Sequence, residues 1–204
     1  MHLFSLHYLP QIKYIKALLQ AEEIAFEMME HFQRQTYRNR CEIYTADGIH
    51  KLIVPVSHNT RQKERSCITD VRIAYHDNWR LQHLRTIKSA YQSSSYFEYF
   101  ESDFIKLYEK KYEFLVDFNI ASLEIILGYL KKPLIFTKTI EYIKNPSGIT
   151  DLREAFTDNN YTLDFEYYQV FQGKKGVIGN LSSIDLLFNA GPQRMLELLN
   201  LSLV

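Results

Sequence analysis

The segment Arg40–Val56, RCEIYTADGIHKLIVPV, carries the clearest local signal for a fold in this chain. Its two halves alternate between apolar and polar residues on either side of Asp47-Gly48, and a period of two is the pattern of a half-buried β-strand. Asp-Gly supplies the left-handed backbone conformation that a tight hairpin turn requires. The segment therefore predicts a β-hairpin in the first half of the chain.

A β-α-β unit is predicted on the N-terminal side of this hairpin. Residues 3–9, LFSLHYL, read as a short buried strand that ends at Pro10, and proline is well placed at the first position of a helix. Apolar residues then recur at helical spacing in residues 11–21. Residues 23–29, EIAFEMM, are apolar and predict the second strand.

The rest of the chain completes a mixed fold. The polar segment 57–67 predicts an exposed loop. Further elements are expected as strands at 68–74, 133–140 and 165–171, helices at 77–91 and within 93–132, a short helix within the loop-rich segment 144–160, and a turn at 172–180. This order predicts an α+β fold, with a mixed sheet and the hairpin mainly in the N-terminal half and helices mainly in the C-terminal half. The length suits a single domain, 1–204, with residues 77–132 as a candidate helical subdomain.

Composition limits the classes of function. The 24 Lys and Arg residues are balanced by 24 Asp and Glu residues, so no net field attracts a polyanion and we expect no nucleic-acid partner. No segment approaches about 20 continuous apolar residues and the N-terminus lacks a secretory pattern, so we expect a cytoplasmic protein without a membrane partner. Neither Cys41 nor Cys67 belongs to a zinc pattern and no glycine-rich phosphate loop is present. The sequence predicts no metal and no cofactor.

Several motifs, taken together and in order, resemble the WbqC-like family. They are YLPQIKY at 8–14, TYRNRCEI at 36–43, LIVPV at 52–56, and YYQVFQGKKGVIGNLSSIDLLFNAGP at 167–192. The resemblance spans nearly the whole chain, and the last motif is the most specific. It implies a cytoplasmic protein linked to genes for O-antigen and other surface polysaccharides, with a biosynthetic role whose reaction is not settled.

The sequence departs from the family pattern at two places. Many members are similar to HQPNYxPWxGY at the N-terminus, whereas here Phe4-Ser5 stand at the His-Gln positions and His7 at the Asn position. Members also carry paired aspartates after the second strand, which fall near Met28-Met29 here, beside Glu27 and Glu30. If the family's chemistry uses those groups, this chain has lost or moved it. The resemblance therefore leaves open whether the chain is an enzyme.

The segment 35–41, QTYRNRC, contains the first candidate ligand contacts. If a strand begins by Tyr37, alternation places Tyr37 and Asn39 on one face and Arg38 and Arg40 on the other. Asn39 with Arg40 matches the family's Asn-Arg pair, and a planar guanidinium suits a phosphate or carboxylate. We expect this pair to contact an anion and Arg38 to face solvent. A nucleic-acid interpretation would need further basic residues, and the obvious ones are Arg61, Lys63 and Arg65.

His7 is the candidate acid–base residue. It lies near the carboxyl end of the first predicted strand, and the carboxyl end of a strand is a usual ligand position in α/β units. Imidazole titrates near neutral pH, which suits proton transfer. A lone histidine at such a place is more often a packed side chain, so a structural interpretation competes with the catalytic one.

The motif at 180–192, NLSSIDLLFNAGP, also has two interpretations. Ser182 and Asp185 have the spacing of a capping box, and Gly191-Pro192 would end one helix and begin the next. Alternatively, Asn180 or Asp185 lines a pocket at a helix N-terminus, where anions bind.

Two functional hypotheses follow. In the first, the chain binds an anionic small molecule such as a nucleotide sugar, with group transfer as the candidate chemistry. Arg40 and Asn39 would orient the anion, His7 would act as acid or base, and Tyr8 and Tyr37 would pack against the ligand. In the second, the chain is a non-catalytic binding or assembly partner in a polysaccharide pathway. If His7, Asn39, Arg40 and Asp185 do not converge on one cleft, most of the first hypothesis fails. The reaction, the sugar and the oligomeric state, including a homo-oligomer, stay open.

Overall fold

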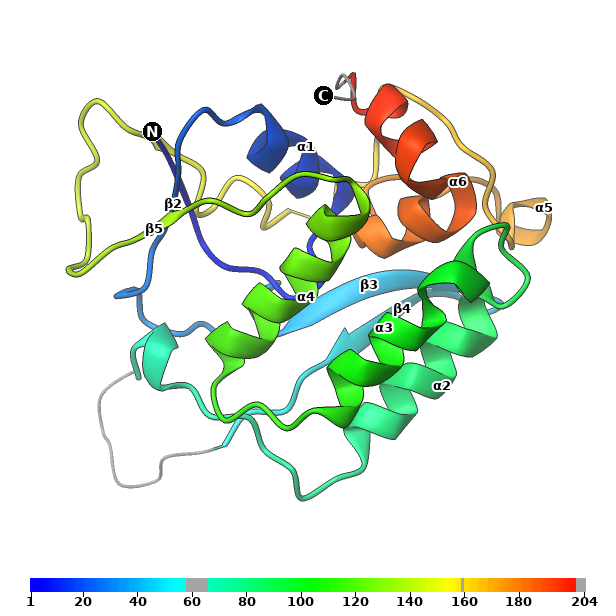
Figure 1. Ribbon diagram of the computed structural model, residues 1–204, viewed down its shortest axis with the longest axis horizontal. Coiled ribbons are helices and arrows are strands. Elements are labelled where there is room, and N and C mark those ends of the chain that lie inside the picture. Colours follow the sequence, from blue (N-terminus) through cyan, green and yellow to red (C-terminus); the bar gives the residue numbers. More distant parts are fainter. Residues whose placement is uncertain (58–65, 159, 201–204) are drawn as a thin grey trace.

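A parallel sheet joins segments that are far apart in the sequence (Figure 1). The computed structural model describes residues 1–57, 66–158 and 160–200. Within them, the order β5-β2-β1-β6 is made by β1 (His2–Phe4), β2 (Ile24–Phe26), β5 (Thr137–Lys138) and β6 (Thr150–Asp151). Each neighbouring pair is parallel. Helix α1 (Ile12–Gln20) connects β1 to β2, so the predicted β-α-β unit is confirmed.

The predicted hairpin is also confirmed. It consists of β3 (Arg40–Thr45) and β4 (Gly48–Ile53), which pair in antiparallel fashion. Thr45 pairs with Gly48, so the turn is formed by Ala46 and Asp47, one residue earlier than the sequence suggests. Gly48 opens β4 with a φ of 110°, a conformation that glycine adopts without steric cost.

Four longer helices pack around this hairpin and against one another (Figure 1). They are α2 (Trp79–Tyr91), α3 (Phe97–Glu109), α4 (Leu115–Tyr129) and α6 (Ser183–Leu198). Helix α2 packs on β3 and α3, and α4 packs on α3 and α6. Their buried side chains join those of α1 and the hairpin in a continuous hydrophobic core. The α+β prediction is confirmed. No helix among the described residues is long and apolar enough to cross a bilayer.

Helix α6 contains the break that the sequence predicts. Gly191 has a φ of 76° inside the helix, and Pro192 begins the second part. A Cβ atom on Gly191 would lie 2.7 Å from the ring of Tyr96, which packs against the break. Glycine is therefore required at this position for two reasons, the left-handed backbone and the lack of space.

Several predicted elements differ from the structure. Residues 68–74 contain a short 3₁₀ helix, η1 (Ile68–Asp70), in place of a strand. The segment 165–171 is not a strand, because side chains rather than a backbone ladder hold it, and α5 (Gln172–Lys175) replaces the predicted turn. Segment 144–160 contributes β6 and no helix within its described part. The basic residues Arg61, Lys63 and Arg65 lie outside the described residues.

Candidate functional site

The carboxyl ends of the parallel strands lie at one edge of the sheet. Ser5 follows β1, Glu27 follows β2, Thr139 follows β5, and Arg153 comes shortly after β6. The strand order reverses at β1, because the chain extends the sheet to β2 and β5 on one side and then places β6 on the other. In open parallel sheets, ligands bind outside the carboxyl ends at such a switch point. The polar residues of this edge therefore form the candidate site.

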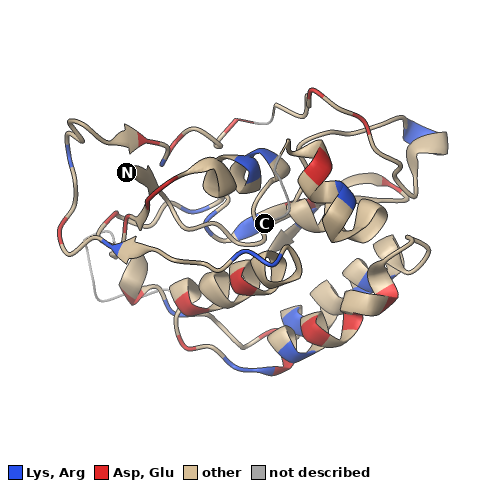
Figure 2. Ribbon diagram, turned by 45° about the horizontal axis from the view of Figure 1, so that its top comes forward, with Lys and Arg blue, Asp and Glu red and all other residues tan. Residues whose placement is uncertain are grey.

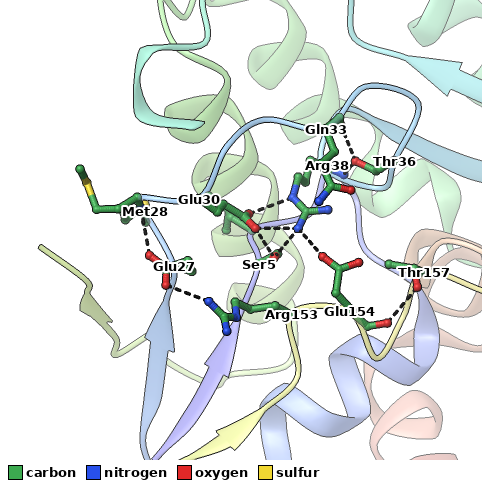
Figure 3. Close-up of polar contacts among 12 residues, drawn as sticks. Ser5, Glu27, Met28, Glu30, Gln33, Thr36, Arg38, Arg153, Glu154 and Thr157 are labelled. Carbon is green, nitrogen blue, oxygen red and sulfur yellow. Dashed lines mark hydrogen bonds and ion pairs between the residues drawn. The ribbon is translucent and has the colours of Figure 1, made fainter. Parts of the chain in front are cut away.

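Arg38 is the centre of the first ion-pair cluster at this edge (Figure 3). Its Nε and Nη2 donate to Glu30 Oε1 and Oε2 at 2.9 and 2.6 Å, so the carboxylate is held in a bidentate manner. Nη2 also donates to Ser5 Oγ at 2.8 Å and to Glu154 Oε1 at 3.0 Å. The Arg38 side chain is 0% exposed and that of Glu154 is 60% exposed. Burial acts to lower the pKa of Arg38, but the two carboxylates outweigh it and raise the pKa.

Arg153 is the centre of a second cluster, which ties the ends of two strands together (Figure 3). Its Nε and Nη2 donate to Asp151 at 2.9 and 2.7 Å, at the end of β6. Its Nη1 donates to Glu27 Oε2 at 3.2 Å, after β2, and to the carbonyl of Ile143. The hydrogen bond from Arg153 lowers the pKa of Asp151. This cluster holds the edge of the sheet, and its donors are occupied.

The charges at the edge are not balanced. Two guanidinium groups are surrounded by the four carboxylates of Glu27, Glu30, Asp151 and Glu154. Even so, Arg38 Nη1 is buried and has no hydrogen-bond partner among the described residues. Buried polar atoms are nearly always paired, so an unpaired one marks a position for a water molecule or a ligand atom.

His7 lies beside Arg38 and is buried, with 1% of its surface exposed. Its ring stacks on Tyr14 at 4.8 Å between centroids and lies 5.9 Å from Tyr37. Burial, followed by the charge of Arg38, lowers the pKa of His7 to about 3. The imidazole is therefore neutral near pH 7. Its Nδ1 also lacks a partner within the described part of the chain.

Tyr37 connects this edge to the base of the hairpin. The guanidinium of Arg40, the first residue of β3, lies over the Tyr37 ring, 5.5 Å from its centre. The hydroxyls of Tyr37 and Tyr161 donate to Glu42 Oε2 at 3.1 and 2.6 Å. Burial, followed by the charge of Glu42, raises the pKa of Tyr37. Arg40 is half-buried, and its Nε has no partner in the described residues. His7, Tyr37 and Arg40 are thus brought together.

Asn39 and Asn180 make hydrogen bonds that hold the backbone. Asn39 Nδ2 donates to the carbonyl of Val54 at 3.1 Å, which closes the base of the hairpin. Asn180 Oδ1 accepts from the backbone N–H of Lys13 at 3.0 Å, and its Nδ2 donates to the carbonyl of Asn160. Both side chains are buried.

Tyr8 lies on the helical side of the core, away from this edge. Its hydroxyl bonds to that of Tyr108 and to His83 Nδ1, the latter at 3.2 Å. Phe118 of α4 stacks on its ring at 5.4 Å between centroids. Tyr8 therefore belongs to the packing between the N-terminal segment and the helices.

Asp185 lies in a further buried cluster within α6. Its carboxylate accepts from the hydroxyls of Tyr91 and Tyr167 at 2.8 and 2.6 Å, and from Gln169 Nε2 at 3.1 Å. The capping-box prediction is wrong, because the Ser182 hydroxyl donates to the carbonyl of Leu9 instead. Burial raises the pKa of Asp185. The carboxylate holds segment 165–171 and α2 against α6. Asp185 shares no described partner with His7 or Arg40, so the four residues expected to converge do not form one site.

Arg38 was expected in solvent, and that expectation is wrong. Strand β3 begins at Arg40, and residues 34–39 form turns, so alternation counted from Tyr37 does not apply. Arg153 and Glu154 lie in no sequence motif or periodic pattern that predicts a site. Two features of the sequence point to this edge. They are Glu27 and Glu30, beside the positions of the paired acids, and His7, near the end of a predicted strand.

Metal ligation is not suggested at the edge. In residues 1–57, 66–158 and 160–200, no group of three or more His, Cys, Asp or Glu side chains is arranged to hold a metal ion. The acids of the edge are instead occupied by the two arginines.

Comparison with known proteins gives one finding. The model of the WbqC-like protein family matches residues 6–147, well over half of the chain. The match ends before β6, so Arg153, Glu154 and the motif at 167–192 lie outside it. No curated protein and no solved structure matches the chain.

Proposed function

The chain belongs to the WbqC-like protein family, and from that premise we propose that it binds an anionic small molecule of the activated-sugar type. The site is the carboxyl edge of the parallel sheet around Arg38. The process is surface-polysaccharide biosynthesis, which the family resemblance implies.

The observation that carries this proposal is the unpaired Arg38 Nη1 at the switch point of the sheet. A buried guanidinium donor without an acceptor is unfavourable, and a ligand oxygen would satisfy it. The neighbouring His7 Nδ1 is likewise buried without a described partner. Two such groups near one strand end support a binding position there.

We assign direct ligand contacts to His7, Arg38, Tyr37 and Arg40. Arg40 stacks on Tyr37, and Tyr37 lies next to His7, so the second arginine adjoins the same region. Asn39 acts by fixing the hairpin base from which Arg40 extends. Tyr8, Asn180 and Asp185 support the surrounding fold rather than the ligand.

A non-catalytic binding role is the second candidate, and one observation favours it. The pKa of His7 is about 3, far from the value near the working pH that suits a general acid or base. In the proposed site, His7 is therefore a neutral hydrogen-bond partner. Group transfer would need another proton carrier, such as one on the ligand.

The test measures binding of a nucleotide sugar and of the free nucleotide by calorimetry. Arg40→Ala is the informative variant, because Arg40 is half-buried and its loss leaves no buried carboxylate unpaired. We expect it to weaken binding by about tenfold, as for a lost charge-assisted contact of roughly 1.5 kcal/mol.

Arg194→Ala is the matched control, because Arg194 is an exposed arginine on α6 that pairs with Glu197. It should bind like the unmodified protein. Equal affinity of the Arg40→Ala variant, or no binding of any nucleotide sugar by the unmodified protein, would contradict the proposal.

A further inference from the structure

Glu154 is a second carboxylate on an arginine that already has one. Glu30 takes Nε and Nη2 of Arg38 in a bidentate pair and is itself buried. Glu154 adds a single contact at 3.0 Å to Nη2. The charge of Arg38 is thus compensated without Glu154.

The contact from Glu154 can be released at small cost. Its side chain is 60% exposed, whereas Arg38 is 0% exposed. It extends from the segment after β6, which has neither helix nor strand over its described residues 152–158. A carboxylate that leaves this ion pair regains water, and the buried guanidinium keeps Glu30 as its counter-charge.

The position that Glu154 occupies suits an oxyanion with two oxygens. Glu154 accepts from Nη2 of Arg38 and not from Nη1. Nη1, the other terminal nitrogen, has no partner among the described residues. A carboxylate or phosphate can accept from both terminal nitrogens of a guanidinium at once. The neighbouring Arg153 offers no such position, because Asp151, Glu27 and the Ile143 carbonyl take its donors.

We propose that Glu154 holds the place of the ligand's anionic group, and that a phosphate or carboxylate of the ligand displaces it to pair with Nη1 and Nη2 of Arg38. The inference rests on the proposed function, since it concerns the same site. It adds that, in the free protein, the side chain of Glu154 occupies the anion position on Arg38. Affinity is then set partly by competition with its own side chain.

The experiment compares the unmodified protein with Glu154→Gln and Glu154→Ala. The matched control is Asp158→Asn, an exposed acid in the same segment for which no ion pair is described. The probes are a uridine diphosphate sugar, glucose 1-phosphate, glucuronate and uncharged glucose. Kd is measured by calorimetry, and circular dichroism checks that each variant folds.

We expect both Glu154 variants to bind the anionic probes about threefold or more tightly, because the ligand no longer displaces a competing carboxylate. Binding of glucose and by the Asp158→Asn variant should be unchanged. If the affinity rises for glucose 1-phosphate alone, the group that displaces Glu154 is a phosphate. If it rises for glucuronate alone, that group is a carboxylate. An unchanged Kd in the Glu154 variants, with the unmodified protein binding, overturns the inference and leaves the proposed site standing. Failure of every probe to bind overturns both.

Discussion

At the scale of single residues, the burial of His7 makes the stability of the protein depend on pH. The pKa of His7 is about 3 in the folded chain, because burial and Arg38 disfavour the imidazolium. Burial also lowers the pKa of His83 to about 4. An unfolded histidine has a pKa near 6.5. Between these values the unfolded chain binds protons that the folded chain does not.

Stability should therefore fall as the pH decreases below about 6.5. Each of the two histidines contributes a slope of up to about 1.4 kcal/mol per pH unit, since the proton uptake favours unfolding. The measurement is the free energy of unfolding in urea between pH 7 and pH 5, above the range of most carboxylates. His7→Gln should remove its share of the slope. The control variant His76→Gln changes an exposed histidine and should keep the full slope. An unchanged slope in the His7→Gln variant would contradict the contribution assigned to His7.

The residues of the proposed site are only partly predictable from the sequence. The sequence motifs select His7, Tyr37 and Arg40, and the structure brings these three together, although alternation places Tyr37 and Arg40 on opposite faces. The burial of Arg38 is not predicted because residues 34–39 form turns, where alternation does not apply. Its contact with Glu154 spans 116 residues, and that of Arg153 with Glu27 spans 126. Contacts over such separations depend on strand order, which no local pattern contains.

At the scale of elements, the break in α6 at Gly191 packs tightly against the ring of Tyr96. Gly191 combines a φ of 76° with a neighbouring ring, so a methyl group there meets both backbone strain and Tyr96. Gly128, within α4, has no atom within 4 Å of its Cβ position and no such backbone demand. The two glycines form a natural pair for comparison.

Gly191→Ala should lower the free energy of unfolding by about 1–3 kcal/mol, because a strained left-handed residue costs that much. Gly128→Ala should leave it unchanged or raise it by up to about 1 kcal/mol, since alanine favours a helix interior. Urea denaturation of both variants measures the difference. Similar effects at the two positions would contradict the steric explanation.

Elements with strong local signals were predicted, and elements made by distant pairing were not. The hairpin and the helices between 77 and 132 follow from alternation, turn residues and helical periodicity. Strands β5 and β6 have two residues each, too few for any period, and exist because they pair with β2 and β1. Segment 165–171 looks like a strand, yet Tyr167 and Gln169 bind Asp185.

At the scale of the whole molecule, charge is balanced in number and mixed in space. The 24 basic residues equal the 24 acidic ones, and Figure 2 shows both signs interspersed on the same helices. Recognition of a nucleic-acid backbone needs a coherent basic surface. The described residues offer none on these helices.

We therefore expect no binding to duplex DNA or single-stranded RNA at physiological salt. Fluorescence anisotropy with labelled oligonucleotides would measure this, with a salt titration as the control for electrostatic binding. A Kd tighter than about 1 μM with a steep salt dependence would contradict the expectation, because non-specific binders are typically weaker than that.

The shortness of the outer strands has a consequence for how this protein can change. Two-residue strands supply few ladder bonds, so Arg153 fastens the end of β6 to the end of β2 through Asp151 and Glu27. Arg38 likewise joins the segments that follow β1 and β2, through Ser5 and Glu30. Arg38, at the proposed ligand position, is thus also one of the side chains that hold the sheet together. A lineage that alters its specificity at this edge would have to exchange Arg38 and Glu30 together, since loss of either one alone leaves a buried charge unpaired.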